Sequence, residues 1–494
     1  MITPTFELFS EKTKEGNLIP VYQEILADTE TPISAFLKIQ EGDYSYLLES
    51  VEGGEKWGRY SFLGTNPSII IKGSGTTVEI QQDGCCQTLY NENPLQVLKD
   101  VMAKFKQVQI EGLPRFASGA VGFIGYEGVR FFENIHFKSE QTNTDFFFMF
   151  TDTFLVFDNL KHKIKIVTNA LIENHDLQKS YNKAVAKIDA TIARIQAPMP
   201  KTHPLLSIAK KEKTTVMPPV SNTTKEAFIQ SVHKAKELIS AGDIFQVQIS
   251  QRFSVPIHAD PFTVYRTLRS INPSPYMYYL QWGSRYIVGT SPEVLVRLEN
   301  RRAELRPIAG TRRRGKTAQE DIALEKELLA DPKERAEHIM LVDLGRNDLG
   351  RVCEYGSVQV TELMVVERYS HVMHIVSNIV GQLRQEYDAF TLLKACFPAG
   401  TVTGAPKIRA MQIIDALESD SRGLYAGTVG YFGFDGNMDT CITIRTIVIE
   451  DNIAMVQAAA GIVADSDPDC EYQETVNKAR AMLSAIEMAE QGVL

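Results

Sequence analysis

Two segments of the chain begin alike, and each carries a pair of glutamates that could bind a metal ion. Asp331-Pro332 and Asp467-Pro468 are strong helix-start signals, because Asp accepts hydrogen bonds from free backbone N–H groups and Pro fits the first turn. A Glu-x-x-Glu follows each start, and this spacing places both carboxylates on one helix face. The four carboxylates belong to Glu334, Glu337, Glu471 and Glu474. If the two helices meet, their oxygens would form a site for a hard cation such as Mg²⁺.

A solvated helix face is the simpler interpretation of any single Glu-x-x-Glu. The same spacing in Glu52-Gly-Gly-Glu55 shows how readily it arises. The shared Asp-Pro context favours a metal site, although helical spacing alone does not show that two distant helices meet. In the second copy the same face continues to Lys478.

Three further segments could take part in chemistry. Pro398–Lys407 is a run of small residues that leads into a predicted helix over 407–417. Its free backbone N–H groups could bind an anion. Alternatively, the segment is a plain turn. Arg445 lies in Cys441–Ile449, which predicts a strand, and a half-buried Arg there requires a carboxylate from the protein or from a substrate. Ala458–Ile462 predicts a strand of small side chains, which suits close approach of a ligand or tight packing.

Several other kinds of site are not expected. Gly119–Gly125 lacks the Gly-x-Gly-x-x-Gly spacing and a Walker lysine, so it does not indicate a nucleotide loop. No Cys or Ser lies in a nucleophile elbow, which argues against covalent acyl chemistry. The net charge of −9 and the lack of a basic stripe argue against nucleic-acid binding.

The composition indicates a soluble, cytoplasmic protein with no membrane association. The 494 residues are 44% hydrophobic and 23% charged, which is ordinary for a globular chain. Residues 1–16 lack the pattern of a signal peptide, and the apolar run Phe146–Phe157 is too short to span a bilayer. The six cysteines show no Cys-x-x-Cys spacing, as expected in a reducing cytoplasm.

One stretch divides the chain. Residues 197–222 contain five prolines and four lysines without a sustained period, which is typical of a linker or surface loop. We therefore expect one domain over 1–196 and a second domain over 223–494.

The elements on both sides mix strands with helices, which indicates an α+β fold. Gln178–Ile195 predicts an amphipathic helix, and Thr223-x-x-Glu226 a capping box that opens another. In 244–253 the apolar Phe245, Val247 and Ile249 alternate with polar residues, as in a strand. Further strands are predicted at 44–49, 59–63, 67–72, 76–81, 145–157, 162–168, 276–282, 285–290, 294–299, 302–306, 369–381, 425–434, 440–449 and 453–463.

Six longer motifs together resemble the chorismate-utilising enzymes. They are Asp-Ile-Phe-Gln-Val-Gln (243–248), Thr-Ser-Pro-Glu (290–293), Pro-Ile-Ala-Gly-Thr-Arg (307–312), Ala-Glu-His-Ile-Met-Leu-Val-Asp-Leu-Gly-Arg-Asn-Asp (336–348), Gly-Thr-Val-Thr-Gly-Ala-Pro-Lys (400–407) and Glu-x-x-Glu-Thr-x-x-Lys (471–478). The resemblance covers nearly the whole chain. It implies a layered β-sandwich of mainly antiparallel sheets wrapped by helices, with the active site in a cleft. It also implies that 1–196 is an N-terminal regulatory or structural domain and that 223–494 is the catalytic domain.

Within the family the chain resembles the branch that forms anthranilate from chorismate and ammonia. Isochorismate-forming members carry a water-activating lysine where this chain has Gln246, and an amide is no base. Aminodeoxychorismate-forming members of one type carry a lysine where this chain has Ala309, which leaves room for ammonia to reach the ring. Formation of 4-amino-4-deoxychorismate by a lysine-free enzyme stays the alternative, as does a regulatory subunit without catalysis.

The resemblance also implies a role for each matching residue. Glu293 matches the general acid that protonates the departing hydroxide, and His374 matches a histidine near the reacting ring. The four glutamates would hold Mg²⁺, with Glu337 and Glu474 as inner-sphere ligands. The substrate-binding positions are Gln246, Ala309, Gly310, Thr311, Thr401, Tyr425, Arg445, Ala459, Gly461 and Lys478.

A feedback site for L-tryptophan is implied by two other segments. The matching residues are Leu48, Glu49, Ser50, Ser61, Pro275, Tyr276 and Met277. Family members usually take ammonia from a separate glutamine amidotransferase subunit, in a heterotetramer of two large and two small subunits. The lack of a nucleophilic cysteine elbow in this chain agrees with that arrangement.

Overall fold

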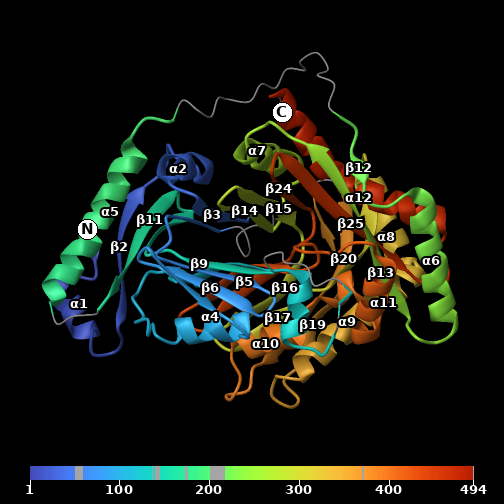
Figure 1. The fold of residues 1–494 in the computed structure, drawn as a ribbon, viewed down its shortest axis with the longest axis horizontal. Helices are drawn as coiled ribbons and strands as arrows, with labels where there is room; N and C mark the ends of the chain where they lie inside the picture. The colour runs from blue at the N-terminus through green and yellow to red at the C-terminus, as the bar shows by residue number, and fades with distance from the viewer. Residues whose placement is uncertain are drawn as a thin grey trace.

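The computed structural model of the chain describes residues 1–50, 59–135, 137–138, 145–172, 176–200, 217–369 and 372–492 (Figure 1). Two large antiparallel sheets dominate it, and helices cover their outer faces. The expected α+β sandwich is therefore confirmed. In the described part of the chain no helix combines the length and apolar character needed to cross a membrane.

Within the described residues, the first sheet has 13 strands. In spatial order they are β1 (Ile2–Thr3), β2 (Leu18–Leu26), β11 (Lys163–Leu171), β10 (Thr153–Asp158), β4 (Tyr60–Thr65), β3 (Tyr44–Glu49), β14 (Tyr276–Trp282), β15 (Arg285–Ser291), β24 (Thr446–Glu450), β25 (Ile453–Ile462), β13 (Gln246–Pro256) and β12 (Val220–Ser221), with β21 (Gly404–Ala405) paired to β13.

The second sheet has 12 strands in the part of the chain that the structure describes. Their order is β18 (Ile308–Arg313), β20 (Val372–Gln382), β17 (Arg302–Leu305), β16 (Val294–Glu299), β23 (Met438–Ile442), β22 (Thr428–Gly433), β8 (Gly119–Ile124), β9 (Phe146–Phe150), β5 (Ile69–Ser74), β6 (Thr77–Gln82) and β7 (Cys85–Leu89), with β19 (Gln359–Arg368) paired to β20.

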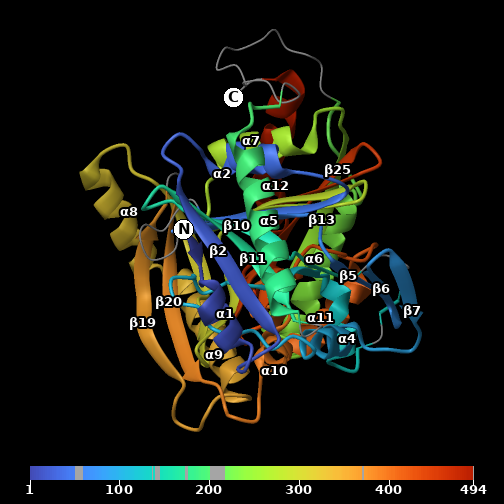
Figure 2. The same cartoon turned by 90° about the vertical axis from the view of Figure 1, so that its left-hand side faces the viewer.

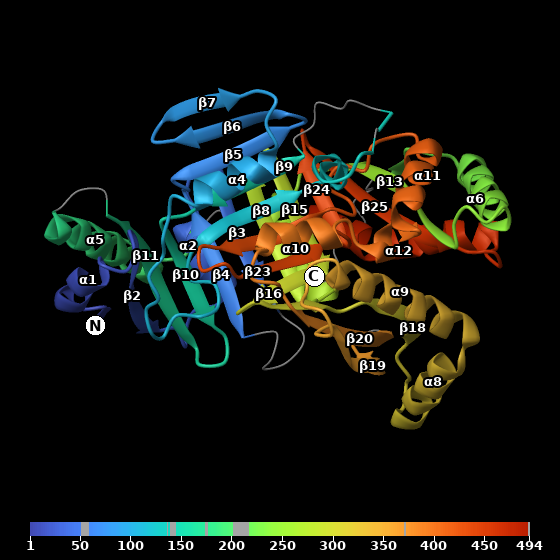
Figure 3. The same cartoon turned by 90° about the horizontal axis from the view of Figure 1, so that it is seen from below.

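Helices flank these sheets. They are α1 (Phe6–Lys12), α2 (Pro32–Ile39), α4 (Pro94–Met102), η1 (Tyr126–Phe131), α5 (Leu177–Gln196), α6 (Lys225–Ser240), α7 (Pro261–Ile271), α8 (Ala318–Ala330), α9 (Pro332–Gly350), α10 (Ala389–Cys396), η2 (Gly400–Val402), α11 (Lys407–Leu417) and α12 (Pro468–Gln491). Helix α5 packs on β2 and β11 (Figure 2), and α9 lies along β18 and β20 (Figure 3).

Strands from both halves of the sequence share both sheets. Leu47 of β3 is opposite Tyr279 of β14, and Gly122 of β8 is opposite Gly430 of β22. Residues 201–216 of the predicted linker lie outside the described residues. The division into domains over 1–196 and 223–494 stays a prediction. In the structure, strands from both ranges are hydrogen-bonded to one another in the same two sheets.

The apolar core has three layers because the central strands are buried on both faces. In β9, Phe147 and Met149 pack between the sheets, whereas Phe146 and Phe148 face the helices outside the second sheet. This arrangement explains the unbroken apolar run in β9, since a strand covered on both sides needs no polar face.

Several sequence-based boundaries differ from the structure. The run 145–157 forms two strands, β9 and β10, and the strand predicted over Cys441–Ile449 is also two. Strand β23 belongs to the second sheet and β24 to the first, so the chain crosses between sheets at 443–445. Arg445 adopts a φ of 52° there, which a continuous strand does not allow.

The start of the segment 223–494 also differs from the sequence-based prediction. Thr224, not Thr223, caps α6 by accepting a hydrogen bond from the N–H of Ala227. Phe245 precedes β13 and is 72% exposed, so it does not share the buried face of Val247. The glycine-rich Gly119–Gly125, which was not expected to bind a nucleotide, contains the central strand β8.

Candidate active site

The largest group of predicted site residues lines one cavity of about 530 Å³. It lies where the chain crosses between the two sheets, and the first turns of α9 and α12 close it. All the predicted catalytic, substrate-binding and metal-binding residues line it except Gln246. Gln246 contacts a lining residue, since its Nε2 donates to Oε1 of Glu337 at 2.9 Å.

The twin helix starts are confirmed. Asp331 caps α9 by accepting from the N–H groups of Lys333 and Glu334, and Asp467 caps α12 by accepting from Cys470. Pro occupies the first turn of both helices. The caps fix where each helix begins, so both Glu-x-x-Glu faces point into the same cavity.

Two of the four glutamates already have a cationic partner. Arg312 pairs with Glu334 at 3.1 Å, and Lys478 pairs with Glu474 at 2.6 Å. Glu337 and Glu471 have no ion pair within the described residues. Burial raises the pKa of both carboxyls. An unpaired, desolvated carboxylate pair is costly unless a cation joins it.

The four carboxylates are therefore ligands of the right chemical type for a divalent cation, but their positions do not yet form a complete coordination site. Among the described residues, no three His, Cys, Asp or Glu side chains converge closely enough to hold one ion. Arg312 and Lys478 hold two of the carboxylates in other contacts. The glutamates can serve as the all-oxygen ligand set of Mg²⁺ once these two contacts are exchanged.

Glu293 lies at the other crossing between the sheets, between β15 and β16. The N–H of Ile442 donates to the carbonyl of Glu293 at 3.0 Å, and the hydroxyl of Ser291 donates to the carbonyl of Ile442 at 2.7 Å. These bonds tie the crossing at 292–293 to the one at 443–445. Burial raises the pKa of Glu293 to about 8, so its carboxyl is largely protonated at neutral pH. The raised pKa expected of a general acid is present.

His374 on β20 presents a neutral ring to the cavity. Its Nδ1 lies 3.0 Å from the carbonyl oxygen of Gly310 and 3.0 Å from the hydroxyl of Thr311. Because a carbonyl only accepts, Nδ1 carries the proton, and Nε2 is left as an acceptor. Burial lowers the pKa of His374. Gly310 has a φ of 65°, at an irregularity where β18 pairs with β20.

Two cations on the opposite wall can bind carboxylates. The guanidinium of Arg445 donates to the backbone carbonyl of Lys478 at 2.5 Å, and it has no ion pair within the described residues. Burial lowers the pKa of Arg445. The ammonium of Lys478 also donates to the carbonyl of Ala459 at 3.0 Å. Tyr425 lies in the same cavity, and burial raises its pKa to about 12, so its hydroxyl remains a donor.

The small side chains of β25 make room for these groups. A Cβ atom at Gly461 would lie 2.7 Å from Nε2 of Gln246 and 2.8 Å from Nε2 of Gln248. The absence of a side chain at Gly461 therefore leaves room for the two amides in these positions. The sequence interpretation missed Gln248, Lys333 and Asn477, which also line the cavity. Gln248 shares the strand face of Gln246, and this period of two was the available signal.

The segment Pro398–Lys407 forms part of the cavity wall, and its one cationic side chain, Lys407, is already ion-paired. Helix α11 begins at Lys407, as predicted, but the ammonium of Lys407 pairs with Asp348 at 2.8 Å. Thr401 lines the cavity, and its side chain is hydrogen-bonded to the carboxyl of Glu293.

A second cavity of about 60 Å³ lies between β3, β14 and the second sheet. The predicted tryptophan-site residues that line it are Leu48, Glu49, Ser50, Pro275, Tyr276 and Met277. Ser61 does not line it, because strand alternation turns Ser61 away from the face of Tyr60 and Phe62, and its hydroxyl accepts a hydrogen bond from Asn159. Glu49 is held by Arg269 at 3.0 Å and by the hydroxyl of Tyr265.

The fold and this cavity place the protein in a known class. The pattern of the chorismate binding enzyme family matches residues 45–484, and the chain belongs to this family. The resemblance read from the six motifs is thereby confirmed.

Particular relatives are similar over their whole length. The chain is 49% identical over 491 residues to anthranilate synthase component 1 of Acetivibrio thermocellus, covering 99% of each chain. It is 50% identical over 478 residues to anthranilate synthase component 1 of Aquifex aeolicus, covering 96% of each. The solved structure of anthranilate synthase component I from Streptococcus pneumoniae TIGR4 matches with a TM-score of 0.77 and 38% identity, over 93% of this chain and 98% of that one.

Proposed function

We propose that the protein converts chorismate and ammonia to anthranilate, pyruvate and water, as component I of an anthranilate synthase. The observation that carries the proposal is the grouping of Glu293, Arg445 and the four glutamates in one cavity. The names of the full-length relatives support the same product.

Chorismate is a dianion, so its site must supply positive charge in a negatively charged protein. Arg445 and Lys478 provide two cations beside the small side chains of β25. Arg445 is held by the carbonyl of Lys478 and has no ion pair in the described structure, so its guanidinium can receive a substrate carboxylate. Tyr425 offers a neutral donor beside it.

The reaction consists of a substitution on the chorismate ring followed by an elimination. The nitrogen of ammonia forms a bond at C2 while the C4–O bond breaks, and the leaving hydroxide takes the proton of Glu293 and departs as water. The added nitrogen is then a cation, and the proton that it loses restores the acid form of Glu293. The C2 proton and the enolpyruvyl group are then lost together, which gives the aromatic ring and pyruvate. Protonation of the leaving group by Glu293 accounts for its raised pKa, since an ionised carboxyl would have no proton to donate.

The remaining polar groups set the geometry. Nε2 of His374 is an acceptor at the ring side of the cavity, and Gly310 fixes its orientation through Nδ1. Glu334, Glu337, Glu471 and Glu474 would hold Mg²⁺. When bound, the ion neutralises the ring carboxylate and withdraws electron density from the diene.

Two residues favour ammonia over other nucleophiles. Gln246 is occupied by its hydrogen bond to Glu337 and cannot act as a base. Ala309 lines the cavity with a single methyl group, which leaves space at the ring. Formation of 4-amino-4-deoxychorismate is the second candidate. That reaction would use the same carboxylate-binding residues and the same four glutamates, and it differs in the ring carbon to which the nitrogen is attached.

We also propose the wider setting of the reaction. The cavity at Leu48 and Met277 would bind L-tryptophan as a feedback inhibitor. A glutamine amidotransferase subunit would supply ammonia in a cytoplasmic heterotetramer of two large and two small chains.

The assay uses the purified chain with chorismate, MgCl₂ and ammonium salt, followed by anthranilate fluorescence. Anthranilate should form without any partner protein, and formation should depend on both Mg²⁺ and ammonium. Exclusive formation of 4-amino-4-deoxychorismate would assign the chain to the other branch.

A further inference from the structure

Arg422 is a buried arginine that lies just outside the active-site cavity, among the segments that form its wall. Its guanidinium donates two hydrogen bonds to the carboxylate of Glu418, at 3.0 and 2.8 Å. It donates two more, both at 2.7 Å, to the backbone carbonyls of Val402 and Gln248. Because these acceptors belong to separate segments and the guanidinium is rigid, Arg422 sets the distances between the segments.

The arginine compensates for the end of a short strand ladder. β21 pairs with the start of β13, and the N–H of Gln248 still donates to the carbonyl of Thr403 at 2.9 Å. The N–H of Thr403 donates to the carbonyl of Gly400, so it returns no hydrogen bond to Gln248. A buried carbonyl needs a donor, and Arg422 supplies it to Gln248.

Glu418 continues the same edge of β13 two positions further along. Its carboxylate accepts hydrogen bonds from the N–H and the hydroxyl of Ser250, both at 2.8 Å. The hydroxyl of Ser250 accepts in turn from the amide of Gln457 at 2.8 Å, and Gln457 lines the active-site cavity. The ion pair of Arg422 and Glu418 therefore takes the place of a neighbouring strand.

Aromatic and backbone contacts hold Arg422 in this position. Its guanidinium lies 5.6 Å from the ring centroid of Tyr425 and 4.8 Å from that of Tyr126. The carboxylate of Glu127 accepts from the backbone N–H groups of Arg422 and Gly423, at 2.8 and 3.0 Å. Tyr425, which lines the cavity, is thus packed against the same guanidinium that holds β13.

We propose that the ion pair of Arg422 and Glu418 positions the wall of the cavity that binds chorismate. Arg422 contacts three lining residues directly, namely Gln248, Val402 and Tyr425. Neither Arg422 nor Glu418 lines the cavity, so both are positioning residues and not catalytic ones. The proposal rests on the proposed function, because chorismate is the substrate of that reaction.

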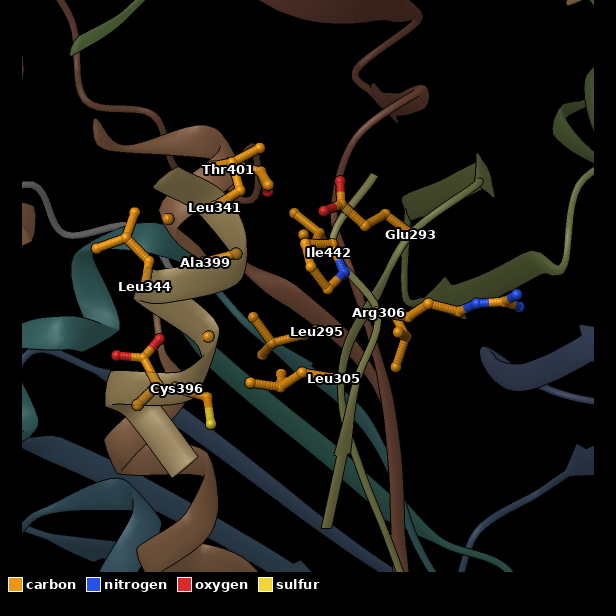
Figure 4. Close-up of a pocket in the computed structure, with 15 residues that line it drawn as sticks. Glu293, Leu295, Leu305, Arg306, Leu341, Leu344, Cys396, Ala399, Thr401 and Ile442 are labelled. Atoms are coloured by element: carbon orange, nitrogen blue, oxygen red, sulfur yellow. The ribbon is translucent and has the colours of Figure 1, made fainter. Parts of the chain in front are cut away.

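The turn that Arg422 holds also carries a contact of the acid. Thr401 precedes Val402, and its side chain is hydrogen-bonded to the carboxyl of Glu293. Figure 4 shows these two side chains at the same end of a small pocket of about 40 Å³. A displacement of the turn would therefore move Thr401 relative to Glu293 as well as Val402 relative to the substrate.

The main test replaces Arg422 by lysine. Lysine keeps the charge, but its donors share one nitrogen and cannot reach four acceptor atoms in the directions of a planar fork. Arg422→Lys should raise KM for chorismate about tenfold, since misplaced binding groups cost up to about 10²-fold. A purely structural defect would lower the amount of folded enzyme, which reduces the apparent kcat and leaves KM unchanged.

Arg285→Lys is the matched control. Arg285 also pairs with a glutamate, Glu450, and lies over an aromatic ring, that of Trp282, but it does not line the cavity. Its replacement should leave KM for chorismate at the wild-type value. The melting temperature of each variant shows whether it is folded.

A milder variant decides the matter if Arg422→Lys does not fold. Ser250→Ala removes only the hydroxyl that links Glu418 to Gln457, and KM for chorismate should rise about fivefold, as for the loss of one hydrogen bond. Ser45→Ala removes a buried hydroxyl that is bonded to Gln281 in the same sheet, and it should leave KM unchanged.

A wild-type KM in folded Arg422→Lys or in Ser250→Ala would overturn the proposal, and so would an equal rise in the two controls. A failure of the proposed function is recognised separately, because the wild-type chain would then form no anthranilate. Titration calorimetry with chorismate and MgCl₂, without ammonia, still tests the wall in that case. Weaker binding by Arg422→Lys than by Arg285→Lys supports the positioning role, and equal binding, or none by the wild type, overturns it.

Discussion

The amide of Gln246 donates a hydrogen bond to the carboxylate of Glu337 at 2.9 Å. This contact joins β13 of the first sheet to the first turns of α9. Gln246 thus stands at the position where isochorismate-forming enzymes carry a lysine base. It also holds the carboxylate of Glu337, which would bind the metal ion. The other amide atom, Oε1, is buried without a hydrogen-bond partner.

Loss of this contact should weaken metal binding. In Gln246→Leu the Glu337 carboxylate loses its donor in a buried site, which raises its pKa further and favours the protonated form. We expect the affinity for Mg²⁺ at neutral pH to fall about tenfold, the lower end of typical effects for residues that orient metal ligands. Isothermal titration with MgCl₂ measures it, and Gln248→Leu on the same strand face should change it much less. Equal affinities in the two variants would refute this role.

Removal of the acid should slow the reaction without preventing binding. Glu293→Gln keeps the shape of the side chain but has no proton to donate, so kcat should fall by about 10²–10⁴-fold. KM for chorismate should change little. Activity near that of the wild type would show that another group protonates the leaving oxygen.

The wild-type rate should also depend on pH through Glu293. Because burial raises its pKa to about 8, the acid form predominates below that pH and is lost as the pH rises through it. With ammonia saturating at every pH, kcat should decline on the alkaline side near pH 8. A kcat that is constant to pH 9 would contradict the assigned acid.

Arg445 should contribute mainly to substrate binding. Arg445→Met removes a charge-assisted pair that is worth about 1.5–3 kcal/mol, so KM for chorismate should rise by roughly 10–100-fold. Arg445→Lys should recover part of the loss, because the charge returns without the planar fork. Unfolding curves separate this effect from damage at the left-handed backbone position. If both variants keep the wild-type KM, the substrate carboxylate binds elsewhere.

The predicted tryptophan site offers an independent prediction. Leu48→Trp fills the small cavity beside Met277, so inhibition by L-tryptophan should be lost while ammonia-dependent activity is kept. Leu160→Trp adds the same side chain at an exposed turn and should leave inhibition intact. An inhibition curve for each variant distinguishes them. Retained sensitivity in Leu48→Trp would place the inhibitor at another site.

The sequence predicted best what local signals determine. The Asp-Pro starts of α9 and α12 were read correctly, because a cap and a first-turn proline act within a few residues. The strands 276–282 and 294–299 were also found, since tight turns bound them. The motifs supplied the class of enzyme and most of the cavity wall.

Features that depend on contacts between distant segments were less accessible. An apolar stretch such as Cys441–Ile449 predicts one strand, because periodicity does not reveal which sheet each half joins. The crossing at Arg445 exists because β23 and β24 pair with strands from different parts of the chain. For the same reason the pairing of Gln246 with Glu337, 91 positions apart, was not predicted.

The most direct test of the central claim is the identity of the product made by the isolated chain. Chorismate, MgCl₂ and ¹⁵N-labelled ammonium are incubated with the purified protein. The products are then separated by chromatography and identified by mass spectrometry. We predict ¹⁵N-anthranilate and an equal amount of pyruvate, with neither formed by Glu293→Gln at a comparable rate. Isochorismate or 4-amino-4-deoxychorismate as the sole product would contradict the assignment.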